Sequence, residues 1–215
     1  LEPIRKIREE LGDSIEVALE FHGYWSLPCA IRIAQEAERY SPMWLEEMLP
    51  QDNLAAYAEL AAATSLPLCI SERLMTRWSF RELLANGAAR IVMPDIAWCG
   101  GISEAMKVAH LASAHNILVA PHTLAGLGQV ANVHFAAAIP AHVRSHVEWD
   151  PTLGNPIVEK MLTHPLKVVD GRISVPRGPG LGTDINWDVV KELPFSTGEE
   201  IKGHGKRRNR RWNNP

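Results

Sequence analysis

The sequence has few cysteines and no long apolar run, and these two features exclude several classes of protein. Its three cysteines, Cys29, Cys69 and Cys99, lie far apart among 215 residues. An odd, scattered set of thiols favours neither a disulfide framework nor a thiolate metal site. No stretch of about 18 apolar residues is present, which excludes a membrane-spanning helix. We therefore expect a protein of a reducing compartment, the cytoplasm, with no membrane partner.

The chain has little net charge, because its acids and bases nearly balance, but its bases gather at the C-terminal end. The net charge is −3, and residues 202–215, "KGHGKRRNRRWNNP", hold six Lys or Arg and no acid. A basic tail with one Trp is a possible nucleic-acid contact. Nothing else in the chain has the pattern of a nucleic-acid module, so we interpret the tail as a disordered extension and expect no nucleic-acid partner.

What the sequence does have is an alternation of short apolar runs with longer amphipathic ones. The apolar runs predict strands over residues 15–20, 42–47, 66–72, 90–95, 117–122 and 146–149. The amphipathic runs predict helices over residues 28–40, 53–64, 79–86, 102–115 and 129–139. The strands are hydrophobic almost throughout, which indicates that both of their faces are buried, as in a parallel sheet with crossover helices.

Each predicted strand ends on a polar residue that a buried strand normally avoids. The spacing of these residues, 23 to 27 positions, marks repeated βα units. In a parallel β/α barrel the carboxyl ends of the strands converge on one face, where the chemistry takes place. These strand ends carry Glu20, Glu46, Glu72, Asp95, His122 and Glu148.

The number of units predicts an incomplete (β/α) barrel over residues 1–190. Six units are found, whereas eight units fill a barrel of about 250 residues. A helix-like segment, "IRKIREELG", comes first with no strand before it. We therefore expect a fragment that lacks the N-terminal part of its barrel, followed by a C-terminal extension over residues 191–215. Because an open sheet exposes its edges, we also expect a homo-oligomer.

The strand-end residues predict a metal site next to a base. Glu20, Glu46 and Glu72 form a hard oxygen cluster suited to Mg²⁺, and without a cation their like charges would raise one another's pKa values. Asp95 and His122 form a natural dyad, in which the carboxylate orients the imidazole and raises its basicity. A base beside a divalent cation is suited to removing a proton alpha to a carboxylate.

The motifs resemble the enolase superfamily, in particular its mandelate racemase-like branch. The matching segments are "WLEEML" (44–49), "SERLMTRWSF" (71–80), "MPDIAWCGGISEAMKVA" (93–109), "VAPHT" (119–123), "VEW" (147–149) and "DGRISVPRGPGLG" (170–182). The resemblance implies a barrel domain, normally preceded by a capping domain that we expect to be missing here. It also implies a site in which His122 with Asp95 is the base and Glu148 hydrogen-bonds the substrate. The ligands of Mg²⁺ would be Glu20, Glu46 and Glu72.

Two shorter motifs are similar to the acid-sugar dehydratases of that branch, of the galactonate dehydratase type. "FHG" follows the first ligand, which implies His22 as a general acid, and "ERLMTRW" implies Arg73 as a substrate contact. Trp98 either lines the pocket or packs in the core. The first ligand is normally Asp, and here it is Glu20, one methylene longer.

Three functional hypotheses remain open at this point. The leading one is a Mg²⁺-dependent lyase that dehydrates a small acid sugar. A racemase or epimerase of the same superfamily is the second, and it requires another base on the opposite face of the substrate. The third is a truncated barrel that keeps its ligands but has no activity.

Overall fold

Five short strands form one parallel sheet, in which neighbours along the chain are neighbours in space. The structure is a computed structural model that describes residues 1–122, 126–149 and 160–192. The strands are β1 (Leu19–Glu20), β2 (Leu45–Glu46), β3 (Leu68–Ile70), β4 (Ile91–Val92) and β5 (Leu118–Val119). Each lies inside its predicted range. Parallel pairing in this order places the five carboxyl ends at one edge of the sheet.

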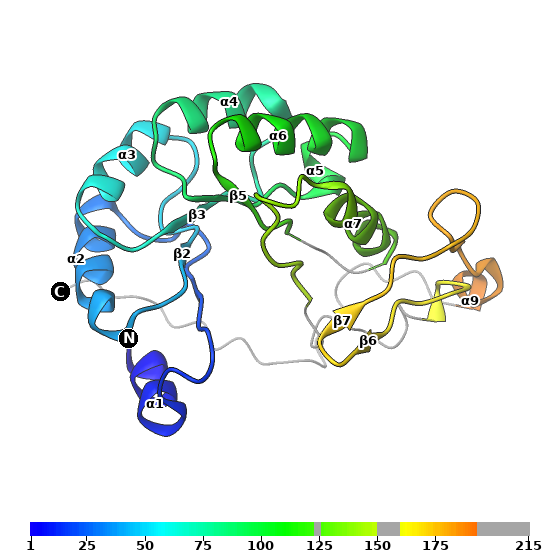
Figure 1. Ribbon diagram of the computed structural model, residues 1–215, viewed down its shortest axis with the longest axis horizontal. Helices are drawn as coiled ribbons and strands as arrows, with labels where there is room; N and C mark the ends of the chain where they lie inside the picture. The colour runs from blue at the N-terminus through cyan, green and yellow to red at the C-terminus, as the bar shows by residue number, and fades with distance from the viewer. Residues whose placement is uncertain (123–125, 150–159, 193–215) are drawn as a thin grey trace.

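The helices that cover the outer side of the sheet are α2 (Leu27–Ala37), α3 (Leu54–Ala62), α4 (Thr76–Ala85), α6 (Ile102–Ala114) and α7 (Leu127–Ala138) (Figure 1). The other helices are α1 (Glu2–Leu11), which precedes β1, the single turn α5 (Ile96–Cys99), and α9 (Trp187–Glu192), which lies away from the sheet (Figure 1). A short 3₁₀ helix, η1 (Glu38–Tyr40), ends the segment predicted as one helix over 28–40. The helix predicted over 79–86 begins earlier, at Thr76. The Asn53 side chain caps α3 by accepting a hydrogen bond from the Ala56 amide.

Strand β3 shows why the apolar runs are continuous. Leu68 and Ile70 point into the large core between sheet and helices, where they join buried residues such as Phe80 of α4. Cys69 points the other way, into a second buried cluster with Trp44 and Ile91. Successive side chains of a strand face opposite sides, so burial on both sides requires apolar residues at every position.

The strand predicted over residues 146–149 is wrong. The chain pairs with β5 slightly earlier, at an isolated parallel bridge between Val119 and Arg144. Two backbone hydrogen bonds hold this bridge, from the Val119 amide to Val143 at 2.7 Å and from the Ser145 amide to Val119 at 3.0 Å. The pairing segment contains Arg144 and lacks the apolar run of a buried strand, so its hydrophobicity did not mark it.

Three further elements were not predicted. The single-turn helix α5 directly follows Asp95, an antiparallel hairpin of β6 (Val168–Val169) and β7 (Arg172–Ile173) lies beyond the sheet, and α9 follows that hairpin along the chain. Within the described residues, the fold is therefore a partial (β/α) barrel with five regular strands and one bridge.

The predicted extension over residues 191–215 lies outside the described residues after Glu192. No helix in the described part of the chain has the length and hydrophobicity to cross a bilayer.

Candidate active site

Three carboxylates meet at the carboxyl edge of the sheet. Glu20 and Glu46 end β1 and β2 and are directly paired in register, and Glu72 follows β3 by two residues. One oxygen from each lies within 4.8 Å of the other two. Glu46 and Glu72 are buried, whereas Glu20 is more exposed. The structure thus brings together the three residues that the sequence predicts as metal ligands.

The electrostatics of this cluster suit a cation. Burial raises the pKa of Glu46 well above its ordinary value, and the neighbouring carboxylates of Glu20 and Glu148 raise it further. The indole nitrogen of Trp44 donates a hydrogen bond of 2.8 Å to Glu46 and opposes that rise. An all-oxygen donor set with this much uncompensated negative charge fits a hard divalent cation such as Mg²⁺.

A histidine and an aspartate form the predicted dyad beside the cluster. His122 Nδ1 lies 2.7 Å from Asp95 Oδ2. The other oxygen of Asp95 accepts hydrogen bonds from the Ala97 and Trp98 amides, at 2.7 and 3.2 Å, and so caps α5. Because Asp95 is anchored to a helix N-terminus, it holds the imidazole in one orientation.

The second nitrogen of His122 faces the carboxylate cluster. His122 Nε2 lies 3.7 Å from Glu72 Oε2 and 3.8 Å from Glu148 Oε2. Burial lowers the pKa of His122, but the hydrogen bond to Asp95 and the charges of Glu148 and Glu72 outweigh it, so the pKa is raised overall. The site therefore holds a basic imidazole whose free nitrogen points at the carboxylates.

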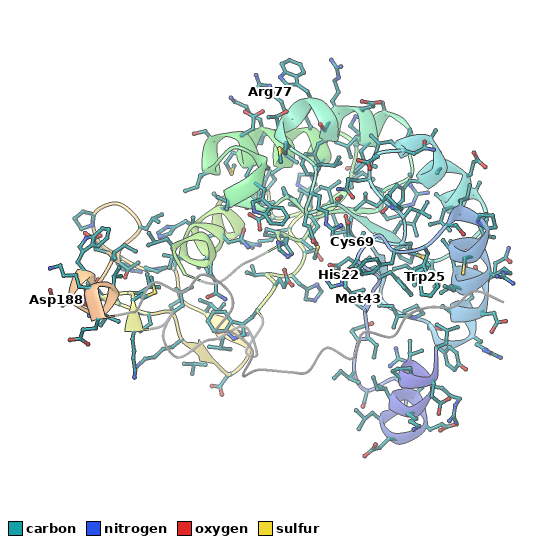
Figure 2. The ribbon with its side chains drawn as sticks, turned by 180° about the vertical axis from the view of Figure 1, so that it is seen from behind. His22, Trp25, Met43, Cys69, Arg77 and Asp188 are labelled. Carbon is teal, nitrogen blue, oxygen red and sulfur yellow. The ribbon has the colours of Figure 1, made fainter. Side chains whose placement is uncertain are left out.

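His22 lies beside Glu20, though not for the reason that the sequence suggests. Strand alternation predicts that the two share a face, but β1 ends at Glu20 and His22 has a left-handed φ of 53°. This turn lets the His22 amide donate a hydrogen bond to Glu20 Oε1 and places His22 Nδ1 3.8 Å from the same oxygen. Figure 2 shows His22 and Cys69 on the inner side of the arc of helices, whereas Arg77 lies on its outer side.

The two predicted substrate contacts also lie at the site. Arg73 Nε lies 3.5 Å from Glu72 Oε1, and the Arg73 side chain is 34% exposed. The ring of Trp98 is tilted against that of His122, with 6.2 Å between their centroids, and Trp98 is 42% exposed. Its exposure beside the dyad favours the pocket-lining interpretation over core packing.

Two site residues were missed by the sequence reasoning. Asn132 of α7, buried, donates to the backbone carbonyls of Pro121 and His122, at 3.3 and 3.1 Å, and so fixes the end of β5. Glu47, the residue after Glu46, is completely buried and lies 3.9 Å from Arg73 Nε. Burial raises the pKa of Glu47 to about 7, and the Ser71 hydroxyl and Arg73 oppose that rise. The sequence held a signal for each of them. Glu47 is the second acid of "LEE", and Asn132 is an amide within a mostly apolar predicted helix.

Comparisons with known proteins agree with this geometry. The family model described as "Enolase C-terminal domain-like" matches residues 1–189. The chain belongs to the enolase C-terminal domain-like family. It is 34% identical to a D-galactonate dehydratase from Ralstonia pickettii (strain 12J), over 88% of this chain and 50% of that protein. It is 33% identical to a D-galactarolactone cycloisomerase from Agrobacterium fabrum, over 90% of this chain and 53% of that protein.

The solved structures agree on the fold. A mandelate racemase/muconate lactonizing enzyme from Sulfitobacter sp. superposes with a TM-score of 0.84 at 34% identity, covering 91% of this chain and 48% of that one. The chain therefore spans about half the length of the relatives that it matches. The resemblance read from the motifs, to the mandelate racemase-like branch of the superfamily, is confirmed.

Proposed function

We propose that this chain carries the active-site residues of a Mg²⁺-dependent acid-sugar dehydratase, a hydro-lyase. The observation that carries the proposal is the juxtaposition of two groups. Three carboxylates each place one oxygen within 4.8 Å of the other two. The Nε2 atom of His122, whose ring is held by Asp95, lies 3.7 Å from one of these carboxylates, that of Glu72. The similarity to a D-galactonate dehydratase supports the substrate class.

Glu20, Glu46 and Glu72 would hold the cation. Their oxygens are close enough to share one ion, and the raised pKa of Glu46, caused first by burial and then by the neighbouring carboxylates, supports a site that a cation would stabilise. When bound, Mg²⁺ supplies positive charge where the substrate carboxylate gains negative charge during proton removal.

His122 then removes the alpha proton of the substrate. Its Nδ1–H donates to Asp95, so the lone pair of Nε2 is left facing the site. The pair of electrons from the broken C–H bond forms a double bond between the alpha carbon and the carboxylate carbon, and negative charge develops on the carboxylate oxygens; the double bond to the beta carbon forms only when the beta hydroxyl leaves. His122 keeps the proton, and Asp95 stabilises the resulting imidazolium. Glu148 would hydrogen-bond the substrate oxygen on which charge develops.

Loss of the beta hydroxyl needs an acid, and His22 is placed to supply it. Hydroxide is a poor leaving group, so the carbon–oxygen bond breaks readily only when a proton reaches that oxygen and water departs. The ring of His22 sits at the rim of the cluster, half exposed and next to Glu20. Arg73 and Trp98 would contact the remaining hydroxyls and the face of the sugar chain.

A second function is favoured by one comparison. The chain is similar to a D-galactarolactone cycloisomerase as well as to dehydratases. In that alternative the same dyad and cation form the enolate, but no hydroxyl leaves. Racemisation or epimerisation would likewise use the dyad without His22 as an acid, together with another base.

The test is a substrate screen with two readouts. The protein, loaded with Mg²⁺, is incubated in D₂O with a panel of aldonates and aldarates, and NMR follows both alpha-proton exchange and formation of 2-keto-3-deoxy products. Dehydration of one acid sugar supports the proposal. Exchange with return of the substrate or its epimer favours racemisation or epimerisation. The absence of exchange and of product with every acid sugar contradicts both.

We also propose that the protein is a homo-oligomer. In the described part of the chain, β1 pairs with β2 on one side only, so its other edge presents unpaired backbone groups. Light scattering coupled to size-exclusion chromatography gives the molar mass in solution. A mass of one chain, 23.8 kDa, contradicts this proposal.

A further inference from the structure

The carboxylate of Glu47 is buried in an unusual way. The residue is 0% exposed, and neither of its side-chain oxygens has a hydrogen bond of normal geometry among the described residues. Burying a carboxylate without hydrogen bonds is costly, and most buried charges in proteins are paired. The backbone of Glu47 has a left-handed φ of 45°, a further cost for a residue with a side chain. A side chain kept under these conditions needs a reason.

The cation that faces Glu47 is the guanidinium of Arg73. Arg73 Nε lies 3.9 Å from Glu47 Oε2 and 3.5 Å from Glu72 Oε1. The guanidinium therefore lies between one carboxylate inside the protein and one at the site. Its backbone is held as well, because the Arg73 amide donates a hydrogen bond of 3.1 Å to the Ser71 hydroxyl.

The outer end of Arg73 is left available. Its side chain is 34% exposed, and its two terminal nitrogens donate no hydrogen bond within the described residues. A guanidinium is a planar fork of five donors, so a guanidinium whose Nε faces two carboxylates presents its remaining donors away from them. Without a second anchor, the guanidinium would be free to turn toward Glu72, where a carboxylate can accept two of its donors side by side.

We propose that Glu47 is a positioning residue: its buried carboxylate shares Arg73 Nε with Glu72 and so keeps the guanidinium from pairing with Glu72 alone, which leaves the terminal nitrogens of Arg73 to bind an oxygen of the substrate. The inference rests on the proposed function for the identity of that substrate. The placement of Arg73 by Glu47 does not depend on it. Glu47 touches no substrate in this account, and it acts through Arg73.

The first experiment measures the placement directly. Protein labelled with ¹⁵N-arginine is studied by NMR, and the Nε–H signal of Arg73 is identified by its disappearance in Arg73→Lys. Because Glu47→Gln keeps the shape of the side chain and removes its charge, we expect the exchange of this hydrogen with solvent to accelerate by roughly tenfold. Glu36→Gln is the matched control, since Glu36 pairs with Arg39 on the surface, 3.2 Å away. Unchanged exchange in Glu47→Gln overturns the inference.

The second experiment measures the effect on substrate. We expect Glu47→Gln to raise KM by roughly tenfold while kcat changes less, and Arg73→Lys to do the same. In the double variant the two effects should not add, because both remove one contact. Full additivity contradicts the inference. Should the wild-type protein act on no acid sugar, the proposed function fails while the exchange measurement still decides the role of Glu47.

Folding is controlled separately. Circular dichroism and thermal unfolding are recorded for each variant. If Glu47→Gln does not fold, Glu47→Asp takes its place, because it keeps the charge and withdraws the carboxylate from Arg73 by one methylene. The same acceleration of exchange is expected of it, and wild-type exchange in the folded Glu47→Asp protein overturns the inference.

Discussion

His122 Nδ1 and Asp95 Oδ2 meet at 2.7 Å although the two residues stand 27 positions apart in the chain and follow different strands. The parallel order of β4 and β5 brings them together, because residues that follow adjacent strands arrive at the same edge of the sheet. The second oxygen of Asp95 is fixed by the N-terminus of α5. The dyad is thus set by the fold and by one helix cap.

Asp95→Asn should leave the fold intact and remove most of the proton abstraction. An Asn oxygen can still cap α5, but its amide group would donate to His122 Nδ1 and force the proton onto Nε2. We expect alpha-proton exchange to fall by about 10²-fold or more. The pKa of His122, raised in the native protein, should fall toward its ordinary value in an NMR titration. Wild-type exchange in this variant removes Asp95 from the mechanism.

Glu72→Gln should weaken Mg²⁺ binding. The substitution replaces a charged oxygen with a neutral one, and loss of even an outer partner typically costs a metal site about 10- to 100-fold in affinity. Calorimetric titration gives the dissociation constant, with the surface variant Glu36→Gln as control. Equal affinity in Glu72→Gln and the wild type means that the cation, if bound, is held elsewhere.

Stabilisation by Mg²⁺ should grow with pH. The folded pKa of Glu46 is raised above its ordinary value of 4.5. The contribution of Glu46 to stability is therefore full below about pH 4.5 and is lost as the pH rises toward the folded pKa. A bound cation stabilises the ionised form of Glu46 in the folded protein and so offsets the stability lost at higher pH. We expect the increase in Tm on adding Mg²⁺ to be larger near pH 8 than near pH 5. An increase that is the same at both pH values contradicts this account of the cluster.

His22→Asn should separate the two halves of the reaction. Asn tolerates the left-handed φ at this position and keeps the amide that binds Glu20, so the fold is preserved. Dehydration should fall by about 10²- to 10⁴-fold, the usual contribution of a general acid, while exchange of the alpha proton by His122 continues. Dehydration at the parent rate makes His22 structural and moves the racemase alternative ahead.

Asn132→Ala should destabilise the protein. The change removes two hydrogen bonds and leaves the buried carbonyls of Pro121 and His122 without a donor. Leaving buried groups unsatisfied typically costs about 1–3 kcal/mol, measurable as a lower free energy of unfolding in urea. Gln35→Ala is the control, since Gln35 makes one exposed hydrogen bond to Ala63. A cost no larger than that of the control would mean that α7 does not anchor the end of β5 through Asn132.

Much of the fold could be predicted because it depends on regular patterns. Continuous hydrophobicity marked each strand of the sheet, and the steady spacing of polar residues indicated which of them share one edge. The pairing at Arg144 escaped prediction because a single bridge needs backbone geometry and no apolar run. The ends of the strands escaped for a similar reason, since they are two or three residues long in runs of up to seven.

In the site, only the residues that stand at the ends of strands could be predicted to meet. Glu20 and Glu46 meet because their strands are paired in register. His22 reaches Glu20 through a left-handed turn that no alternation rule describes. Glu47 was overlooked because its neighbour Glu46 already explained the motif, and because the burial of a second acid depends on how Arg73 packs from the next strand.

The central claim is that His122 removes a proton alpha to a carboxylate beside a bound cation. It is tested most directly by the exchange of the substrate alpha proton with D₂O, followed by NMR for the wild type and for His122→Asn, each with and without Mg²⁺. The account predicts exchange only for the wild type with Mg²⁺. Exchange by His122→Asn at the wild-type rate, or no exchange by the Mg²⁺-loaded wild type with any acid sugar, would contradict it.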